Sequence, residues 1–248
     1  MKNLALAAAF FAASTSLSHA GEGHSHGAIK SEVDNTKVAA FDIVKAHVKR
    51  EGRVITFKME TAGVAGDMAP EKAGSFAGAP IWAYVWPTSL DPKVVGFESG
   101  SGILALAATN HPDFDDTPLF DENVDGDTGN DGGHWHSHWV VLVPNDKCGP
   151  GALAVRDIQK GTNPKMPATW PGVPFFLDSP GYTPVFDGHE IKINVALAAA
   201  ETDAIKGASF DGVTTALKVN ATLHEPNVCV TDVFDIASGD LSLPGKVD

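Results

Sequence analysis

The sequence contains little sulfur, and beyond its first twenty residues it contains no long hydrophobic run. Its two cysteines, Cys148 and Cys229, form no C-x-x-C pair and have no histidine at ligand spacing, so neither a thiolate zinc motif nor a covalent haem motif is present. The few methionines are scattered, which argues against a thioether-rich Cu(I) carrier. No later segment offers about 18 uncharged apolar residues in a row, so we expect no membrane-spanning helix.

Basic residues are also scarce. The chain has 18 Lys and Arg against 31 Asp and Glu, a formal net charge of −13. Such a surface repels phosphate backbones and anionic lipids, which argues against nucleic acid and membrane as partners, and it attracts cations. No convincing P-loop, dinucleotide-binding or serine-nucleophile motif is present.

Residues 1–20 have the features of a secretory signal peptide. Lys2 precedes an uncharged run rich in Ala and Phe, and the small residues Ser18 and Ala20 mark a cleavage site before Gly21. We therefore expect a periplasmic or secreted protein. In an oxidising compartment Cys148 and Cys229 are expected to form a disulfide, with a thiolate metal site as the alternative.

The remainder of the chain shows the pattern of short strands separated by Gly- and Pro-rich loops. Ile55, Phe57 and Met59 alternate with polar residues, and 50–53 supplies a turn, which predicts a hairpin over 38–60. Further strands are predicted near 80–86, 94–109, 134–143, 152–158, 191–197, 217–223 and 228–243, with an irregular proline-rich loop over 160–184. The sequence thus predicts an all-β fold, with a flexible tail over 21–37 and one antiparallel β-sandwich or barrel-like domain over 38–248, with long irregular loops.

Three histidines stand at alternate positions in the motif His134-Trp-His136-Ser-His138. On a strand their rings share one face, and neutral imidazole is a common ligand of zinc and copper. Alternate residues lie about 6.6 Å apart along a strand, so two neighbouring rings reach one ion more easily than three. We therefore expect an adjacent pair plus a ligand from elsewhere, with His111 and Asp113 the best candidates, or a bend of the strand at Gly132 and Gly133. Solvent-exposed histidines on a sheet rim are the alternative.

Two further segments carry possible ligands. His24 and His26 lie in the predicted tail, where they form either a weak, transient metal site or part of a solvated segment. The acidic loop 110–133 contains Asp125, Asp127 and Asp131 at spacings that resemble a calcium loop, although the Gly and Glu of an EF-hand are absent. The loop is otherwise a solvated charged segment or a lid over the histidine site.

These features favour a periplasmic or secreted protein that binds Cu²⁺ or Zn²⁺ for sequestration, delivery or resistance, with a metal transporter or acceptor protein as a candidate partner. Two alternatives remain open. One is a metalloenzyme with an open position on a histidine-bound ion. The other is a module that binds haem or another organic ligand on the aromatic stripe of Trp82, Tyr84 and Trp86. The sequence does not identify the metal, the pair of histidines that share it, or the oligomeric state.

Overall fold

The computed structural model describes residues 27–198, 202–222 and 225–248, so the predicted signal peptide, His24 and His26 lie outside the described residues. The described chain is almost entirely β-structure, which confirms the predicted fold class. Its elements are β1 (Ile29–Lys30), β2 (Ile43–Glu51), β3 (Val54–Thr61), β4 (Pro80–Pro87), η1 (Pro92–Val95), β5 (Ile103–Asn110), β6 (His136–Pro144), η2 (Asp146–Cys148), β7 (Leu153–Val155), β8 (Leu177–Asp178), β9 (Val185–Asp187), β10 (Glu190–Ala196), α1 (Thr202–Ile205), β11 (Ser209–Phe210), β12 (Val213–Val219), β13 (Val228–Ile236) and β14 (Gly245–Lys246). None of the helices in these residues has the length and hydrophobicity that crossing a bilayer requires.

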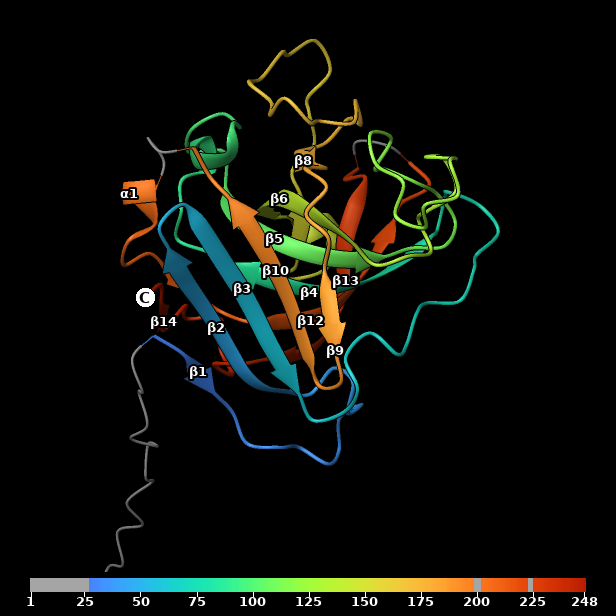
Figure 1. Ribbon diagram of the computed structural model, residues 1–248. Helices are drawn as coiled ribbons and strands as arrows, with labels where there is room; N and C mark the ends of the chain where they lie inside the picture. Colours follow the sequence, from blue (N-terminus) through green and yellow to red (C-terminus); the bar gives the residue numbers. More distant parts are fainter. Residues whose placement is uncertain (1–26, 199–201, 223–224) are drawn as a thin grey trace, which may run out of the picture.

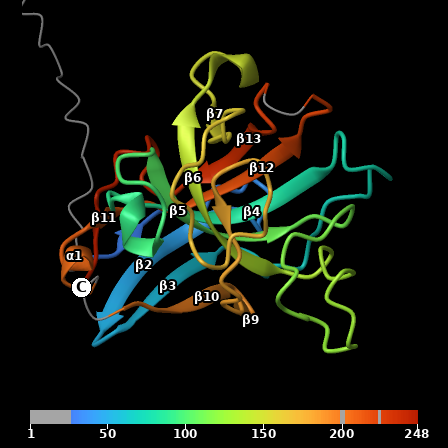
Figure 2. The same cartoon turned by 90° about the horizontal axis from the view of Figure 1, so that it is seen from above.

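Six antiparallel strands form a closed barrel. Their order is β5-β4-β12-β13-β7-β6, and β5 pairs with β6 to close the ring. The short strand β8 pairs with β6 at Trp139 and Val140, on the edge of β6 that pairs with β7 further along. Closure removes the free edges of the sheet, which would otherwise expose unpaired backbone groups. Figure 1 and Figure 2 show these strands as one layer of the molecule.

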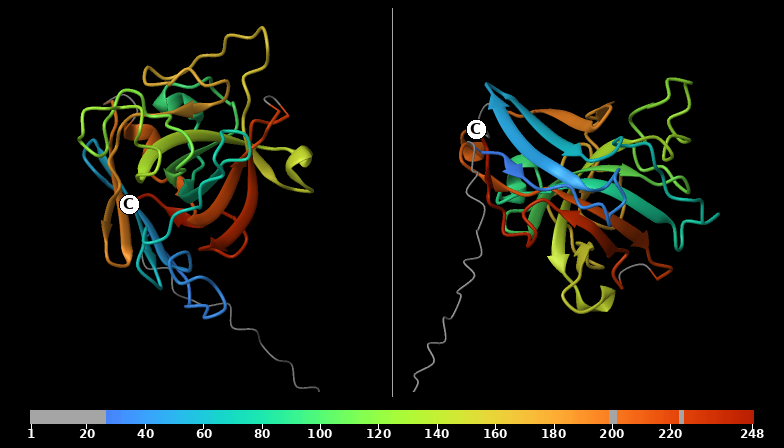
Figure 3. Two further views of the ribbon diagram at one scale, coloured as in Figure 1. Left: turned by 90° about the vertical axis from the view of Figure 1, so that its right-hand side faces the viewer. Right: turned by 90° about the horizontal axis from the view of Figure 1, so that it is seen from below.

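A second antiparallel sheet, β1-β2-β3-β10-β9, packs against one side of the barrel. Figure 3 shows its blue and orange strands beside the barrel. The predicted hairpin is present as β2 and β3, and Gly52, with φ +62°, occupies the turn between them. A backbone with positive φ suits glycine because other residues meet a steric penalty from their Cβ. A turn at Gly188 and His189 likewise joins β9 to β10.

The aromatic stripe of β4 lies between these two layers. Tyr84 and Trp86 are both 0 % exposed, and Trp82 is partly buried against the same core. The Trp86 ring makes an edge contact with Phe57 of β3 at 6.1 Å. The stripe is therefore packed core, and it offers no open platform on which haem could lie.

Strand β6 has a different core on each of its faces. Trp139 and Val141 pack into the core between the two sheets, whereas Val140 and Leu142 pack into the interior of the barrel. This explains why the second half of the strand is apolar at every position. Because side chains alternate along a strand, His136 and His138 share the barrel-facing side with Val140.

One predicted strand begins later than expected. The apolar residues near 94 belong to η1, a short 3₁₀ helix, and strand β5 begins only at Ile103. The Asp91 side chain accepts a hydrogen bond from the Lys93 backbone N–H, and Gly96, with φ +106°, ends the helix. Val94 is buried on this turn, so it gives an apolar signal that resembles a strand.

The predicted disulfide is present. Cys148 and Cys229 are bonded, with a Cα–Cα distance of 5.5 Å. Cys148 ends η2, directly after β6, and Cys229 lies on β13 opposite Ala154 of β7. The bond therefore ties the connection between β6 and β7 to strand β13, next to the single residue pair that joins β7 and β13.

Candidate metal centre

The candidate site lies at one end of the hairpin formed by β5 and β6. In the register of this hairpin Thr109 pairs with His136 and Ala107 pairs with His138, so both histidine side chains face the barrel interior. His111 follows directly after the last residue of β5. The long connection between the strands, residues 111–135, then brings Asp116 back over the same end of the barrel.

Four side chains converge there. The Oδ1 atom of Asp116 lies 3.2 Å from His111 Nε2, 3.3 Å from His136 Nε2 and 3.1 Å from His138 Nε2. The Nε2 atoms of His111 and His136 are 2.9 Å apart. All four residues are buried, with 6 % of Asp116 and 1–2 % of each histidine exposed. Together they form the only group of this kind, offering three or more possible metal ligands, among the described residues.

The outer nitrogen of each ring has its own hydrogen-bond partner. Nδ1 of His111 donates to the Phe114 carbonyl at 3.1 Å, and Nδ1 of His136 donates to the His134 carbonyl at 2.9 Å. Nδ1 of His138 lies 3.2 Å from the Ser179 hydroxyl, which itself donates to the Asp116 carbonyl at 2.7 Å. Ser179 must therefore accept from His138.

These partners fix the tautomer of the rings. A carbonyl oxygen only accepts hydrogen bonds, so in the neutral imidazole the single hydrogen resides on Nδ1 and a bare lone pair remains on Nε2. The same conclusion holds for His138. Ser179 donates its hydroxyl hydrogen to the Asp116 carbonyl, so towards Nδ1 of His138 it acts only as an acceptor. Three lone pairs thus face one another and one carboxylate oxygen, and positive charge among them, from a metal ion or from added protons, makes this arrangement favourable.

Two atoms of the centre have no hydrogen-bond partner among the described residues. These are Nε2 of His138 and Oδ1 of Asp116, although they lie 3.1 Å from each other. The Thr109 hydroxyl, 3.1 Å from His136 Nε2, offers a hydrogen to that ring. A buried polar atom without a partner is costly, so such atoms indicate a missing ligand.

Asp116 has the charge state that a metal ligand needs. Burial alone would raise the pKa of its carboxyl, but when the rings of His138, His111 and His136 carry an extra proton in place of a metal, their charges and hydrogen bonds oppose this and hold the pKa well below its ordinary value of 3.8. A bound cation would act in the same direction. The group therefore presents three nitrogens and one ionised oxygen.

The spacing of these atoms matches one small ion. A tetrahedral ion with bonds of about 2.0–2.1 Å holds its ligands roughly 3.3–3.4 Å apart. The contacts of Asp116 Oδ1, at 3.1–3.3 Å, lie just below this spacing, whereas the bound of 4.8 Å on separations within the whole group exceeds it, so the rings would draw closer around a bound ion. Hydrogen bonds on the outer nitrogens orient rings in known metal sites. The residues present therefore fit a divalent transition-metal ion.

The structure brings together three of the residues that the sequence singled out, His111, His136 and His138. The group of four converging side chains does not include His134, which is exposed because β6 begins only at His136. Nor does it include Asp113, whose two oxygens accept from the backbone N–H groups of Ala73 and Gly74. The expectation of an adjacent histidine pair with ligands from elsewhere matches the arrangement, but the carboxylate is that of Asp116.

Asp116 was not found from the sequence because it stands in a run of similar acids with no periodic pattern. Its neighbour Asp115 instead accepts from the backbone N–H groups of Thr117 and Asp131 and folds the loop. A carboxylate five residues after His111 was the available signal, although loop spacing does not fix where such a side chain points.

The acidic residues proposed for calcium do not converge with this centre. Asp125 and Asp127 are exposed, and each accepts a hydrogen bond from a backbone N–H of their own turn. Asp131 is completely buried, and its Oδ2 accepts from the Glu122 backbone N–H. They shape the loop that carries Asp116.

No relative clarifies the function of this centre. No protein-family model matches the chain, and neither a curated protein nor a solved structure does so. The functional conclusion therefore depends on the chemistry of the four side chains.

Proposed function

We propose that this protein binds one divalent transition-metal ion through His111, Asp116, His136 and His138. The observation that carries the proposal is the convergence of three bare imidazole nitrogens and one carboxylate oxygen at a buried point. Zn²⁺ and Cu²⁺ are the ions we expect. Zn²⁺ suits four nitrogen and oxygen ligands in a compact arrangement, whereas Cu²⁺ binds such ligands more strongly but favours a planar one.

The surroundings of the centre support long retention of the ion. The ligands are almost fully buried, and each outer ring nitrogen is held by a hydrogen bond, so release requires the loop 111–135 to move. This favours sequestration or a resident ion over rapid transfer to a partner. The signal-like residues 1–20 support a periplasmic or secreted location, and a transporter or acceptor protein remains part of this proposal.

Metal content and metal titration test the proposal. Purified protein should contain about one equivalent of ion by elemental analysis, and the metal-free protein should bind Zn²⁺ tightly in a calorimetric titration. The variant His138→Ala should lose tight binding because it removes one of four ligands. Acid should weaken binding because protons compete for the imidazole nitrogens.

The chain supplies matched controls for both ligand types. His134→Ala removes a histidine of the same motif that is exposed and outside the group, so it should leave the affinity unchanged. Asp113→Asn is the corresponding control for Asp116→Asn. Equal losses of zinc affinity in His134→Ala and His138→Ala, or no tight zinc binding by the wild-type protein, would reject the proposed centre.

A metalloenzyme is the second candidate, and one observation favours it. A cavity inside the barrel is lined in part by His111, Asp116 and His138, so molecules in this cavity contact the ligands. A zinc ion with an open position lowers the pKa of a bound water, which then attacks esters. Zinc-dependent hydrolysis of 4-nitrophenyl acetate, lost in His138→Ala and kept in His134→Ala, would support catalysis.

A further inference from the structure

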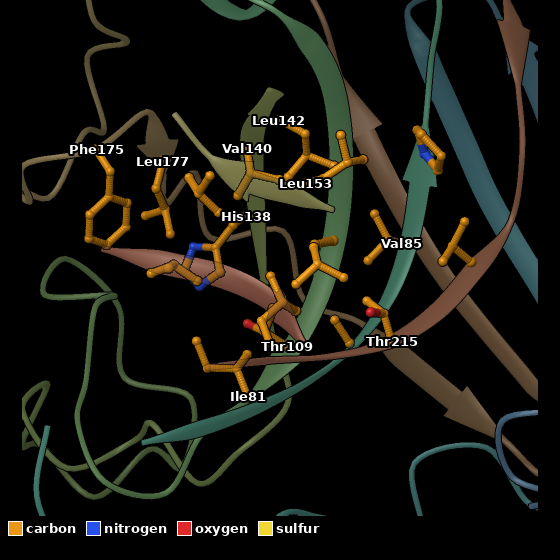
Figure 4. Close-up of a pocket in the computed structure, with 18 of the residues that line it drawn as sticks. Ile81, Val85, Thr109, His138, Val140, Leu142, Leu153, Phe175, Leu177 and Thr215 are labelled. Carbon is orange, nitrogen blue, oxygen red and sulfur yellow. The ribbon is translucent and has the colours of Figure 1, made fainter. Parts of the chain in front are cut away.

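The interior of the barrel contains a cavity of about 160 Å³. Inward-facing side chains of all six barrel strands line it, and nearly all are apolar; they include Ala83, Ala107, Val140, Leu142, Val213 and Leu217. Figure 4 shows such side chains around the space, with the His138 ring among them. An apolar cavity of about 150 Å³ in another protein admits benzene, so this one has room for a molecule of similar size.

One end of the cavity is polar. His111, Asp116 and His138 contribute to its wall, as does Thr109, whereas the fourth member of the centre, His136, does not. An ion held by the four side chains therefore has His136 behind it and the cavity in front of it. Any additional ligand of the ion comes from the cavity.

Away from the polar end the lining side chains are apolar. Leu142, which pairs with Ile103, lies four positions along β6 from His138 and also lines the cavity. Leu241 and Leu243, in the segment after β13, also line the cavity, and both have left-handed backbones with φ of +58° and +55°. Leucine rarely adopts this conformation, so the surrounding structure holds these side chains in place.

Charge indicates what the polar end would accept. A divalent ion with three neutral imidazoles and one carboxylate carries a net charge of +1. A charge beside apolar walls is unfavourable unless it is balanced. A single negative charge on the entering molecule provides that balance and donates an electron pair to the ion.

We propose that the barrel binds a small apolar molecule with one anionic donor group, which coordinates the ion of the His111, Asp116, His136 and His138 centre. This proposal rests on the proposed metal function. The apolar body lies among the inward side chains of the barrel, and the donor group reaches past His138. A small aromatic or aliphatic carboxylate has this chemistry.

Benzoate is the probe, with two matched compounds. Benzamide has nearly the same shape without the charge, and acetate has the same donor group without the apolar body. In calorimetric titrations of the zinc-loaded protein, benzoate should bind at least tenfold more tightly than either compound. Benzoate should also change the visible absorption of the cobalt-loaded protein, because it alters the coordination of the ion.

A cavity variant and a metal-free arm complete the test. Val155→Phe adds volume inside the barrel beside Leu142, four positions along β6 from His138, so it should weaken benzoate at least tenfold while zinc content stays at one equivalent. Metal-free protein should lose the preference for benzoate over benzamide. Zinc binding without any preference for benzoate would overturn this inference alone, whereas absence of zinc binding would overturn the proposed function. The comparison of the three compounds uses wild-type protein and does not depend on the folding of the variant.

Discussion

His111 and His136 bring two imidazole nitrogens within 2.9 Å of each other although each ring donates its only neutral-state hydrogen to a backbone carbonyl on its far side. Two lone pairs at this distance repel unless a cation lies beside them. The backbone of the loop, at Phe114 and at His134, therefore prepares the site before any ion arrives. Carbonyl groups impose the ring orientation, so the site depends on main-chain positions as much as on its ligands.

Ser179 should control metal affinity without touching the ion. Its hydroxyl accepts from His138 Nδ1 and donates to the Asp116 carbonyl. Ser179→Ala therefore removes one hydrogen bond that orients the His138 ring and one that holds the loop at Asp116. Loss of such outer contacts typically weakens metal binding about 10- to 100-fold. Ser137→Ala is the control, because Ser137 lies between two ligands but its hydroxyl donates to the Tyr182 carbonyl. Calorimetric zinc titration of both variants measures the difference, and equal affinities would contradict this role.

Gly132 should be required for the loop that carries Asp116. A Cβ at this position would lie 1.6 Å from the Phe114 carbonyl oxygen, the acceptor of the His111 hydrogen bond. Gly132→Ala should therefore lower both stability, by about 1–3 kcal/mol, and zinc affinity. The neighbouring substitution Gly133→Ala meets its nearest atom at 3.8 Å and should change neither. Chemical denaturation and zinc titration of the pair provide the test, and identical behaviour would refute it.

Asp178 should make the metal-free protein less stable as the pH rises. Burial raises the pKa of this carboxyl from 3.8 to about 6, against the hydrogen bond from Thr169 and the charge of His138. As the pH rises, the carboxyl of Asp178 therefore keeps its proton in the folded protein up to a higher pH than in the unfolded chain. Between pH ~4 and ~6 the free energy of unfolding should fall by up to ~3 kcal/mol.

The variant Asp178→Asn should remove this decrease, and denaturation at several pH values in the presence of a chelator measures it. The exposed Asp232→Asn serves as the control. A bound cation near His138 should reduce this fall in the free energy of unfolding, because it favours the ionised carboxylate of Asp178. An unchanged pH profile in Asp178→Asn would contradict the assignment.

The disulfide should contribute strongly to stability. It links residues 81 positions apart, and in the loop-entropy model such a bond stabilises by about 4 kcal/mol. The double variant Cys148→Ser with Cys229→Ser should lose a comparable amount in denaturant unfolding, and the wild-type protein should lose it with a reductant. A midpoint unaffected by both treatments would show that β7 and β13 hold together without the bond.

The sequence predicted those parts of the fold that depend on local periodicity. Alternation at Ile55, Phe57 and Met59 located one hairpin, and two cysteines in a chain predicted to be exported indicated their bond. The closure of β5 on β6 into a barrel was not predictable, because a sandwich and a barrel share the same alternation. The buried Val94 shows how a helical turn gives the same apolar signal as a strand.

The candidate site was likewise predictable only where the local periodicity of a strand determines the direction of a side chain. His136 and His138 were identifiable because a strand places alternate residues on one face, and His111 because it directly follows the neighbouring strand. His134 fits the same motif but lies before the strand, where alternation no longer governs direction. Asp116 depends on how a 25-residue stretch, 111–135, folds back, and that path is fixed by loop contacts such as those of Asp115 and Gly132.

Trp139 is adjacent to His138 on β6, is almost fully buried, and lies in the other core with its ring against Phe57. An indole one residue from the centre serves as an intrinsic optical reporter of what the centre holds. Paramagnetic Cu²⁺ should quench its emission strongly, whereas diamagnetic Zn²⁺ should not. Fluorescence of the unlabelled protein can therefore distinguish the two ions in solution.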